Sequence, residues 1–339
     1  MGNILTRRAT RRAVLGGMAL GGAMHLGRRV SAQPARPVTI ANASGNNSLT
    51  MQEVMKQQGF LEEFGLQPSV LNIGDGAKIT GGVIGGDIDV SMMSGFAQIF
   101  PAIQRGAKLK VLGGAGVLPW LAVFTSKPDV RTLKDLEGKT VGTGSIGALL
   151  HQMAVALLRK NNVDVDKVRF VNIGGSVDVF RAVVVGTVDA GFGELSIIDQ
   201  QAEFKVRMVE HGNMAVELPE YTYQGSWTSD QMIQRKRDTI VRTMAAYAKL
   251  FRFVQSPESK DSFLRAKKSL FPNGSEKEAL TQWNFIQSYK PFAVDLVLSE
   301  ERLDYMQRLN IELKSQTRVL PFDLIADMSL AREALALLK

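Results

Sequence analysis

A pattern that occurs twice constrains this chain more than any other feature of its sequence. The first copy begins at Asn72-Ile73-Gly74 and ends at Gly86-Asp87-Ile88-Asp89, and the second runs from Asn172-Ile173-Gly174 to Gly186-Thr187-Val188-Asp189. Each copy is typical of a strand, a glycine-bearing turn, a short helix that ends at glycine, and a further strand. Because the order and the spacing both agree, the pattern predicts two homologous α/β lobes.

Strands and short helices alternate through both copies, which predicts parallel sheets. The expected strands span 38–42, 68–73, 88–92, 109–112, 140–142, 168–173 and 188–192. Ser48 is a candidate N-cap for the helix after the first strand. Extended runs at 120–125 and 221–228 are expected to cross between the lobes. The helical segment from 230 onward is expected to pack over the first lobe.

The first 32 residues are typical of an export signal. They hold six arginines and no acidic residue, so the rest of the chain carries a net charge of only +2 of the total of +8. A charge this small does not indicate nucleic-acid binding. Arg11-Arg12 before an apolar run is similar to a twin-arginine (Tat) signal, although the Sec route stays open. The small residues Val30-Ser31-Ala32 predict cleavage that leaves Gln33 first. The apolar run is shorter than the roughly 20 residues of a spanning helix, so we expect a soluble periplasmic protein.

The sequence contains no cysteine, which excludes disulfides, thiol nucleophiles, Cys-ligated metals and a lipoprotein anchor. Outside the leader, His151 and His211 are isolated and indicate neither a catalytic triad nor a metal site. Residues 142–147 have the G-x-G-x-x-G spacing of a dinucleotide loop, but the acid expected at the end of the next strand is missing. We therefore expect no catalytic residue, no metal and no cofactor.

Three segments in order resemble a known family: Gly59-Phe60-Leu61-Glu62-Glu63-Phe64-Gly65-Leu66, Gly85-Gly86-Asp87-Ile88-Asp89-Val90 and Thr132-Leu133-Lys134-Asp135-Leu136-Glu137-Gly138-Lys139-Thr140-Val141-Gly142. They are similar to stretches of ABC-importer solute-binding proteins of the sulfonate, nitrate, taurine and thiamine-precursor (NMT1/THI5-like) group. The resemblance implies an α/β fold of the type II periplasmic binding protein class, with two lobes joined by a two-segment hinge. The expected divisions are an export signal (1–32), lobe 1 (33–125 and 229–339) and lobe 2 (128–222).

Candidate ligand-binding residues lie at the expected carboxyl ends of the strands, where ligands bind in open α/β sheets. These loops are rich in Gly, Ser, Thr and Asn and hold no Lys or Arg, so a ligand could approach backbone N–H groups closely. Glu194 lies near the place where the family often carries an acid within Trp-Glu-Pro, and Trp120 is a candidate lid or stacking residue. The predicted site residues are Ser44, Asn46, Asn47, Asp75, Gly76, Ser94, Gly95, Trp120, Thr143, Ser145, Ile146 and Glu194.

The resemblance implies a monomeric periplasmic protein that captures a small organic solute by hinge closure. The solute would be a sulfonate, a carboxylate or a pyrimidine-like molecule, delivered to an inner-membrane ABC permease. An enzyme on the same fold, such as a pyrimidine-precursor synthase, is the alternative, although such synthases use a Cys-rich cluster and extra histidines that this chain lacks. An accessory binding subunit of a two-component sensor also stays open.

Overall fold

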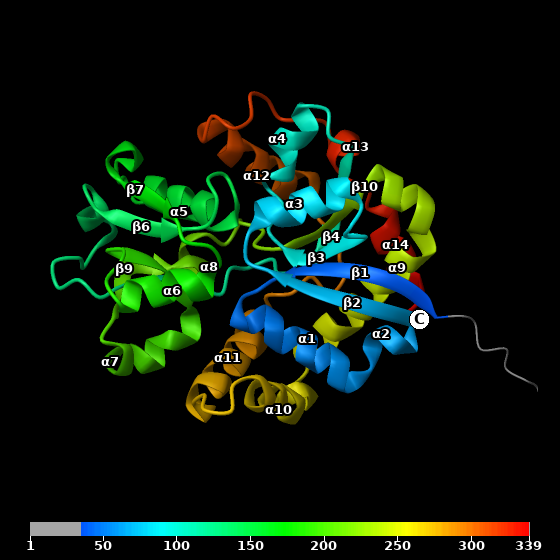
Figure 1. The fold of residues 1–339 in the computed structure, drawn as a ribbon, viewed down its shortest axis with the longest axis horizontal. Helices are drawn as coiled ribbons and strands as arrows, with labels where there is room; N and C mark the ends of the chain where they lie inside the picture. The colour runs from blue at the N-terminus through cyan, green and yellow to red at the C-terminus, as the bar shows by residue number, and fades with distance from the viewer. Residues whose placement is uncertain (1–34, 339) are drawn as a thin grey trace, which may run out of the picture. The chain divides into compact units, whose positions relative to one another are not determined.

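The computed structural model describes residues 35–338, so the predicted export signal lies outside the described residues. The first sheet consists of β1 (Arg36–Ala43), β2 (Leu66–Ile73), β3 (Val90–Ser94), β4 (Leu109–Gly114) and β10 (Gly225–Ser229). Its strand order is β2-β1-β3-β10-β4 (Figure 1). β1 is parallel to β2 and β3, whereas β10 is antiparallel to β3 and β4.

The second sheet has the same plan. It consists of β5 (Leu121–Thr125), β6 (Thr140–Thr143), β7 (Arg169–Asn172), β8 (Ala190–Glu194) and β9 (Arg207–Asn213), in the order β7-β6-β8-β5-β9. β6 is parallel to β7 and β8, and β5 is antiparallel to β8 and β9. The two copies of the repeated pattern therefore occupy equivalent places, β2 to β3 and β7 to β8. The predicted α/β fold is confirmed, and the sheets are mixed rather than wholly parallel, because each contains one antiparallel strand.

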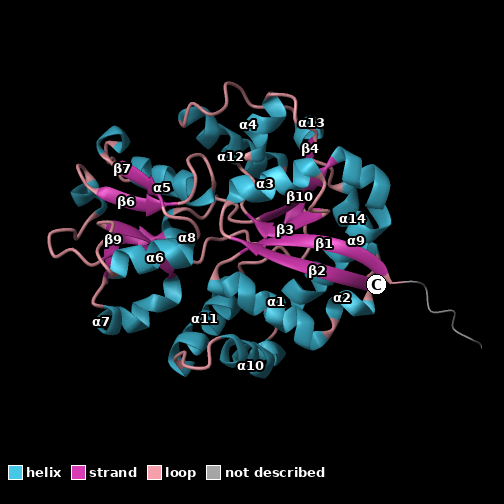
Figure 2. Cartoon of the chain, in the orientation of Figure 1, coloured by secondary structure: helices cyan, strands magenta, loops and turns pink. Residues whose placement is uncertain are grey.

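Helices flank both sheets (Figure 2). Those that follow strands of the first sheet are α1 (Asn46–Gln58), α2 (Phe60–Glu63), α3 (Gly76–Gly85) and α4 (Ile99–Gln104). We call the part of the molecule built on the first sheet the first half and the part built on the second sheet the second half. The helices of the second half are η1 (Leu133–Leu136), α5 (Leu149–Lys160), η2 (Val165–Lys167), α6 (Ser176–Val184), η3 (Leu195–Gln200), α7 (Gln201–Phe204) and α8 (Met214–Glu217). α1 begins before the predicted cap Ser48, with Gly45 in the N-cap position. α3 ends at Gly86 in the left-handed conformation, as predicted.

Both antiparallel strands follow a crossing between the sheets. The stretch that the sequence prediction placed at the end of lobe 1 forms β5, which pairs with β8 and β9 of the second sheet. The other crossing leads into β10. The two crossings are hydrogen-bonded to each other, since the Ala115 amide donates to the Gln224 carbonyl at 2.9 Å and the Gln224 amide donates to the Gly116 carbonyl at 2.8 Å. Two adjacent chain segments therefore connect the halves.

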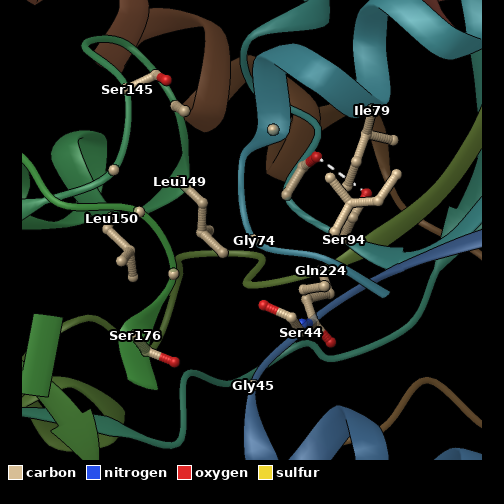
Figure 3. Close-up of a pocket in the computed structure, with 18 of the residues that line it drawn as sticks. Ser44, Gly45, Gly74, Ile79, Ser94, Ser145, Leu149, Leu150, Ser176 and Gln224 are labelled. Carbon is tan, nitrogen blue, oxygen red and sulfur yellow. Dashed lines mark hydrogen bonds between the residues drawn. The ribbon is translucent and has the colours of Figure 1, made fainter. Parts of the chain in front are cut away.

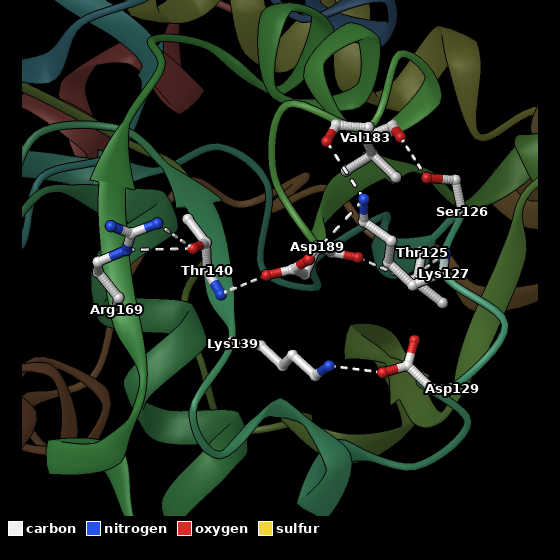
Figure 4. A network of polar contacts seen from close by, with 10 residues as sticks. Thr125, Ser126, Lys127, Asp129, Lys139, Thr140, Arg169, Val183 and Asp189 are labelled. Carbon is white, nitrogen blue, oxygen red and sulfur yellow. Dashed lines mark hydrogen bonds and ion pairs between the residues drawn. The ribbon is translucent and has the colours of Figure 1, made fainter.

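The repeated aspartates tie the strands of each sheet together. Asp189 accepts a hydrogen bond from the Thr140 amide at 2.8 Å, and its carbonyl accepts one from the Thr125 hydroxyl at 2.6 Å (Figure 4). Asp89 makes the same contacts in the first sheet, with the Thr39 amide and the Thr228 hydroxyl. Each aspartate thus joins three strands, which explains why the sequence repeats an acid at this place.

The remainder of the chain is helical. Its helices are α9 (Asp230–Val254), η4 (Pro257–Ser259), α10 (Lys260–Leu270), α11 (Glu276–Tyr289), α12 (Glu300–Glu312), α13 (Phe322–Ile325) and α14 (Ser329–Ala336). α9 packs on α14 and on β3, with Met244, Tyr247 and Phe251 buried. Each such side chain contributes about 1.5–3 kcal/mol. The segment also reaches the second half, because α11 contacts η3 and α12 contacts α5. None of the helices within residues 35–338 is long and apolar enough to cross a membrane.

Candidate ligand-binding site

A cavity of about 50 Å³, here called the cleft cavity, lies between strand ends of the two sheets (Figure 3). Ser44, Gly74 and Gly95, which follow β1, β2 and β3, line it from the first half. Ser145 and Ser176, which follow β6 and β7, line it from the second half. The carboxyl ends of parallel strands from both halves therefore meet around one space, as the sequence predicted.

Glycines allow the halves to approach closely at this place. A Cβ atom on Gly74 would lie 3.3 Å from the Gly175 nitrogen and 3.1 Å from the Ser44 hydroxyl oxygen. A Cβ atom on Gly95 would lie only 2.7 Å from the Cβ of Leu149. Gly74 and Gly175 belong to equivalent turns of the repeated pattern, so the two copies contact each other across the cleft.

Polar contacts also cross the cleft. The Ser145 hydroxyl donates to Asp75 Oδ2 at 2.9 Å, and Asn172 Nδ2 donates to the Ser145 oxygen at 3.3 Å. Asp75 caps α3 as well, since its Oδ1 accepts from the Ala77 amide at 2.8 Å. The carboxylate therefore has two partners, one in each half of the molecule.

Two glutamines give the cleft cavity unpaired acceptors. Gln98 donates its amide to the Gly95 carbonyl at 2.9 Å, which fixes the orientation of the group, and its Oε1 has no partner among the described residues. Gln224 donates to the Ser48 hydroxyl at 3.4 Å, and its buried Oε1 is likewise unpaired within residues 35–338. A buried unpaired acceptor costs about 1–3 kcal/mol, and both oxygens are covered by protein in this conformation.

Several of the predicted site residues line the cleft cavity: Ser44, Gly76, Ser94, Gly95 and Ser145. Ser94 is held by the Trp227 indole N–H at 3.0 Å and by the Ser91 hydroxyl at 2.5 Å. Asp75 lies beside the cavity through its bond to Ser145. A role of these residues in ligand binding stays a prediction.

Other predicted residues lie outside the cleft cavity. Trp120 is buried and packs edge-to-face on Tyr223 at 4.6 Å between ring centroids, so it stabilises the crossings and forms no lid in this conformation. Thr143 is buried and its hydroxyl donates to the Gly144 carbonyl, whereas 69% of Ile146 is exposed. Asn46, Asn47 and Glu194 lie together at the start of α1, where the Asn47 amide donates to Glu194 Oε1 at 3.5 Å.

Sequence reasoning missed several lining residues: Ser48, Gln98, Leu149, Leu150, Gly174, Gly175, Ser176, Tyr223 and Gln224. The turn at 174–176 could have been found, because it is the second copy of the turn at 74–76. Gln98 lies between β3 and α4, and Gln224 lies in the crossing that leads into β10. No local sequence pattern marks either residue. No group of three or more His, Asp or Glu in the described part of the chain could hold a metal ion.

Comparison with solved structures shows the fold of periplasmic binding proteins. The alkanesulfonate-binding protein SsuA from Xanthomonas axonopodis pv. citri, bound to MOPS, aligns with a TM-score of 0.66 and 14% identity over 89% of this chain and 98% of that chain. The periplasmic nitrate-binding protein NrtA from Synechocystis PCC 6803 aligns with a TM-score of 0.71 and 10% identity over 90% and 89%. The desulfurization enzyme DSZB aligns with a TM-score of 0.58 and 15% identity over 90% and 100%.

A search of the curated proteins finds no match. The family model described as NMT1/THI5 like matches residues 46–258, which is more than half of the chain. This match includes the two copies of the repeated pattern, both crossings and all of α9. The chain therefore belongs to the NMT1/THI5-like family.

Proposed function

We propose that this protein is a periplasmic substrate-binding protein that captures a small organic solute for an ABC importer. The observation that carries the proposal is the cleft cavity, which strand ends of both sheets line together. The space of about 50 Å³ is smaller than a usual small-molecule site, so the halves stand farther apart around a solute, which contacts both at once and stabilises that arrangement. The two adjacent crossings would act as the hinge, and an inner-membrane permease would receive the solute from the open form.

The lining of the cleft cavity supports a solute with hydrogen-bond donors. Within residues 35–338 no Lys, Arg, His, Asp or Glu lines it, whereas the oxygens of Gln98 and Gln224 are unpaired acceptors. Hydroxyls of Ser44 and Ser176 can donate or accept. A pyrimidine-like or amide-bearing solute satisfies these groups, while a sulfonate or a carboxylate would bind through serine hydroxyls and backbone N–H groups alone.

Binding is favoured over catalysis by the same lining. DSZB is an enzyme with this fold, so the fold alone does not decide between the two. Acid–base or nucleophilic catalysis needs a side chain with a suitable pKa close to the substrate. The described lining offers serines but no His, Lys, Asp or Glu, the carboxylate of Asp75 beside it is engaged by Ser145 and by the Ala77 amide, and the sequence contains no cysteine. A stable solute that is bound and released unchanged fits these residues best.

The test is a thermal-shift screen of residues 33–339 against sulfonates, nitrate, aromatic carboxylates, pyrimidines and small amides, followed by calorimetry. We expect one class to raise the melting temperature, and the products recovered after incubation to be identical to the solute added. Failure of every class to bind, or conversion of the bound compound, would contradict the proposal.

Export is tested separately on the full chain. Replacing Arg11 and Arg12 by lysine should leave the precursor in the cytoplasm if the Tat route is used. Fractionation and mass analysis of the mature protein measure this. Normal periplasmic levels of the double variant would exclude Tat dependence, and an N-terminus far from Gln33 would contradict the predicted cleavage.

A further inference from the structure

A second cavity, of about 360 Å³, lies on the other side of Ser176, the one residue that also lines the cleft cavity. Residues of α6, η3 and α7 bound it in the second half. Asn46 of α1 and the connection between α10 and α11 bound it in the first half. Its walls are largely apolar, with Phe180, Phe204 and Phe271 among the lining side chains. This volume falls in the range of small-molecule sites.

Two carboxyl groups, from Glu194 and Glu278, also line this second cavity. Glu194 is only 5% exposed, and its Oε2 has no hydrogen-bond partner among the described residues. Its other oxygen accepts a long contact of 3.5 Å from the Asn47 amide, and the Asn46 amide at the start of α1 also lowers the pKa of this carboxyl. Glu278 pairs with Lys267 at 3.1 Å, so the one buried ammonium of this cluster is already engaged.

The cluster of Glu194, Glu278 and Lys267 contains two carboxyl groups but only one ammonium group. A buried carboxylate without a full partner is costly, because desolvation is not repaid by an opposite charge. Burial accordingly raises the pKa of Glu194 to about 7, with Lys267 opposing the shift and Glu278 adding to it. Arg181 also lines the cavity, but its guanidinium is largely exposed and pairs with Asp178 at 3.4 Å. Either a proton or an added cation can therefore complete the cluster.

We propose that the second cavity binds a small organic amine, whose ammonium pairs with Glu194 and whose apolar body packs against the three phenylalanines. An ammonium group supplies hydrogen-bond donors to the unpaired carboxylate oxygen. The aromatic rings remove the apolar body from water and attract the positive charge. The second cavity does not include Gln98 or Gln224 and shares only Ser176 with the cleft cavity, so its polar recognition group is a different one, Glu194.

The experiment compares three compounds of nearly equal shape by calorimetry at pH 8, where the Glu194 carboxyl is ionised. Phenethylamine should bind at least about tenfold more tightly than 2-phenylethanol, which lacks the charge, and than phenylacetate, which has the opposite charge. Equal affinity of the amine and the alcohol would overturn the proposal, because the carboxylate would then play no part. This comparison uses the unaltered protein and does not depend on any variant.

Variants locate the site. Glu194→Gln should remove the preference for the amine, whereas Glu203→Gln, an exposed change on α7 outside the lining, should leave it intact. Phe204→Ala should lower the affinity for the amine and for the alcohol by the same factor, because both lose the same apolar contact. Gln98→Ala, which changes the cleft lining within the first half and adds no clash between the halves, should leave amine binding within about twofold. Loss of amine binding in Gln98→Ala alone would place the amine in the cleft and overturn the proposal of a second site.

Discussion

At the scale of single residues, the cleft is shaped by side chains that are small or absent. Gly74, Gly95 and Gly175 allow backbone from one half to approach the other within van der Waals distance. Ser44 and Ser145 then supply hydroxyl groups at the points of contact. The affinity of such a site depends on a few hydrogen bonds, each of which a single substitution can remove.

Ser145→Ala should weaken solute binding about fivefold. The change removes a hydroxyl that lines the cleft cavity and the bond to Asp75 across it, and one neutral hydrogen bond contributes about 1 kcal/mol. Calorimetry with the solute found in the screen measures the effect. Ser269→Ala, an exposed change on α10, serves as the control. Parent-like affinity of the Ser145 variant would show that this hydroxyl is not used.

Glu194 should make the stability of the protein depend on pH. Burial raises the pKa of its carboxyl from the ordinary 4.5 to about 7. The folded chain therefore keeps a proton that the unfolded chain has lost, and stability is full below pH 4.5 and falls as the pH rises through about 7. Relative to Glu194→Gln, the parent's free energy of unfolding should drop by on the order of 3 kcal/mol across this window.

Urea denaturation at several pH values between 4 and 8 measures that difference. The Glu203→Gln variant should keep the pH dependence of the parent, because its side chain is exposed. Parallel pH profiles of the parent and of Glu194→Gln would show that the carboxyl titrates normally in the folded state.

At the scale of elements, the repeated aspartates fix the register between strands. Asp189 joins β6 to β8 through the Thr140 amide and joins β5 to β8 through its own carbonyl. Asp129 and Lys139 form an ion pair close by at 2.5 Å, but this pair lies at the surface (Figure 4). The same region therefore contains a carboxylate that joins strands, Asp189, and an exposed one, Asp129, and the two can be compared.

Asp189→Ala should lower the free energy of unfolding by about 1–3 kcal/mol, because the Thr140 amide loses its partner at a partly buried position. Asp129→Ala should cost at most about 0.5 kcal/mol, as expected for an exposed ion pair. Chemical denaturation of both variants gives the comparison. Equal effects would mean that the repeated aspartate does not hold the strands.

The sequence predicted the elements better than their directions. The repeated pattern located β2, α3, β3 and their counterparts, because glycine and β-branched residues act locally. It could not show that β5 and β10 enter the sheets antiparallel, since direction depends on the path of the whole chain. In the site, strand-end serines were found, whereas Leu149 and Gln224 lie in segments whose local sequence carries no binding signal.

At the scale of the whole molecule, the two halves are expected to move relative to each other. The crossings connect them, and α11 and α12 contact η3 and α5 of the second half. Asn310 of α12 accepts from Gln152 of α5 at 2.9 Å, and Glu312 pairs with Arg159 at 3.1 Å. The exposed pair of Arg159 and Glu312 can be exchanged for water, whereas Gln152 and Asn310 are fully buried, so their bond is the larger cost of opening.

Gly95→Ala should keep the protein open. The added methyl group would collide with Leu149 only when the halves approach, so each half can fold as before. X-ray scattering should show a smaller radius of gyration for the parent on adding the solute, and no change for this variant. Gly81→Ala adds a methyl group to α3 where no atom lies within 4 Å, and should close like the parent. Closure of both variants would contradict this role of Gly95.

The position of β10 between β3 and β4 also has a consequence for biosynthesis. The ribosome completes β4 at Gly114, but the strand that joins it to the first sheet begins only at Gly225. At roughly 5–20 residues per second, this leaves β4 without its neighbour for about 6–20 s. The second sheet, whose strands are contiguous from β5 to β9, can form during that interval. If the chain folds before export, as on the Tat route, the half that is translated later is therefore expected to fold first, and the earlier half is the one exposed to chaperones.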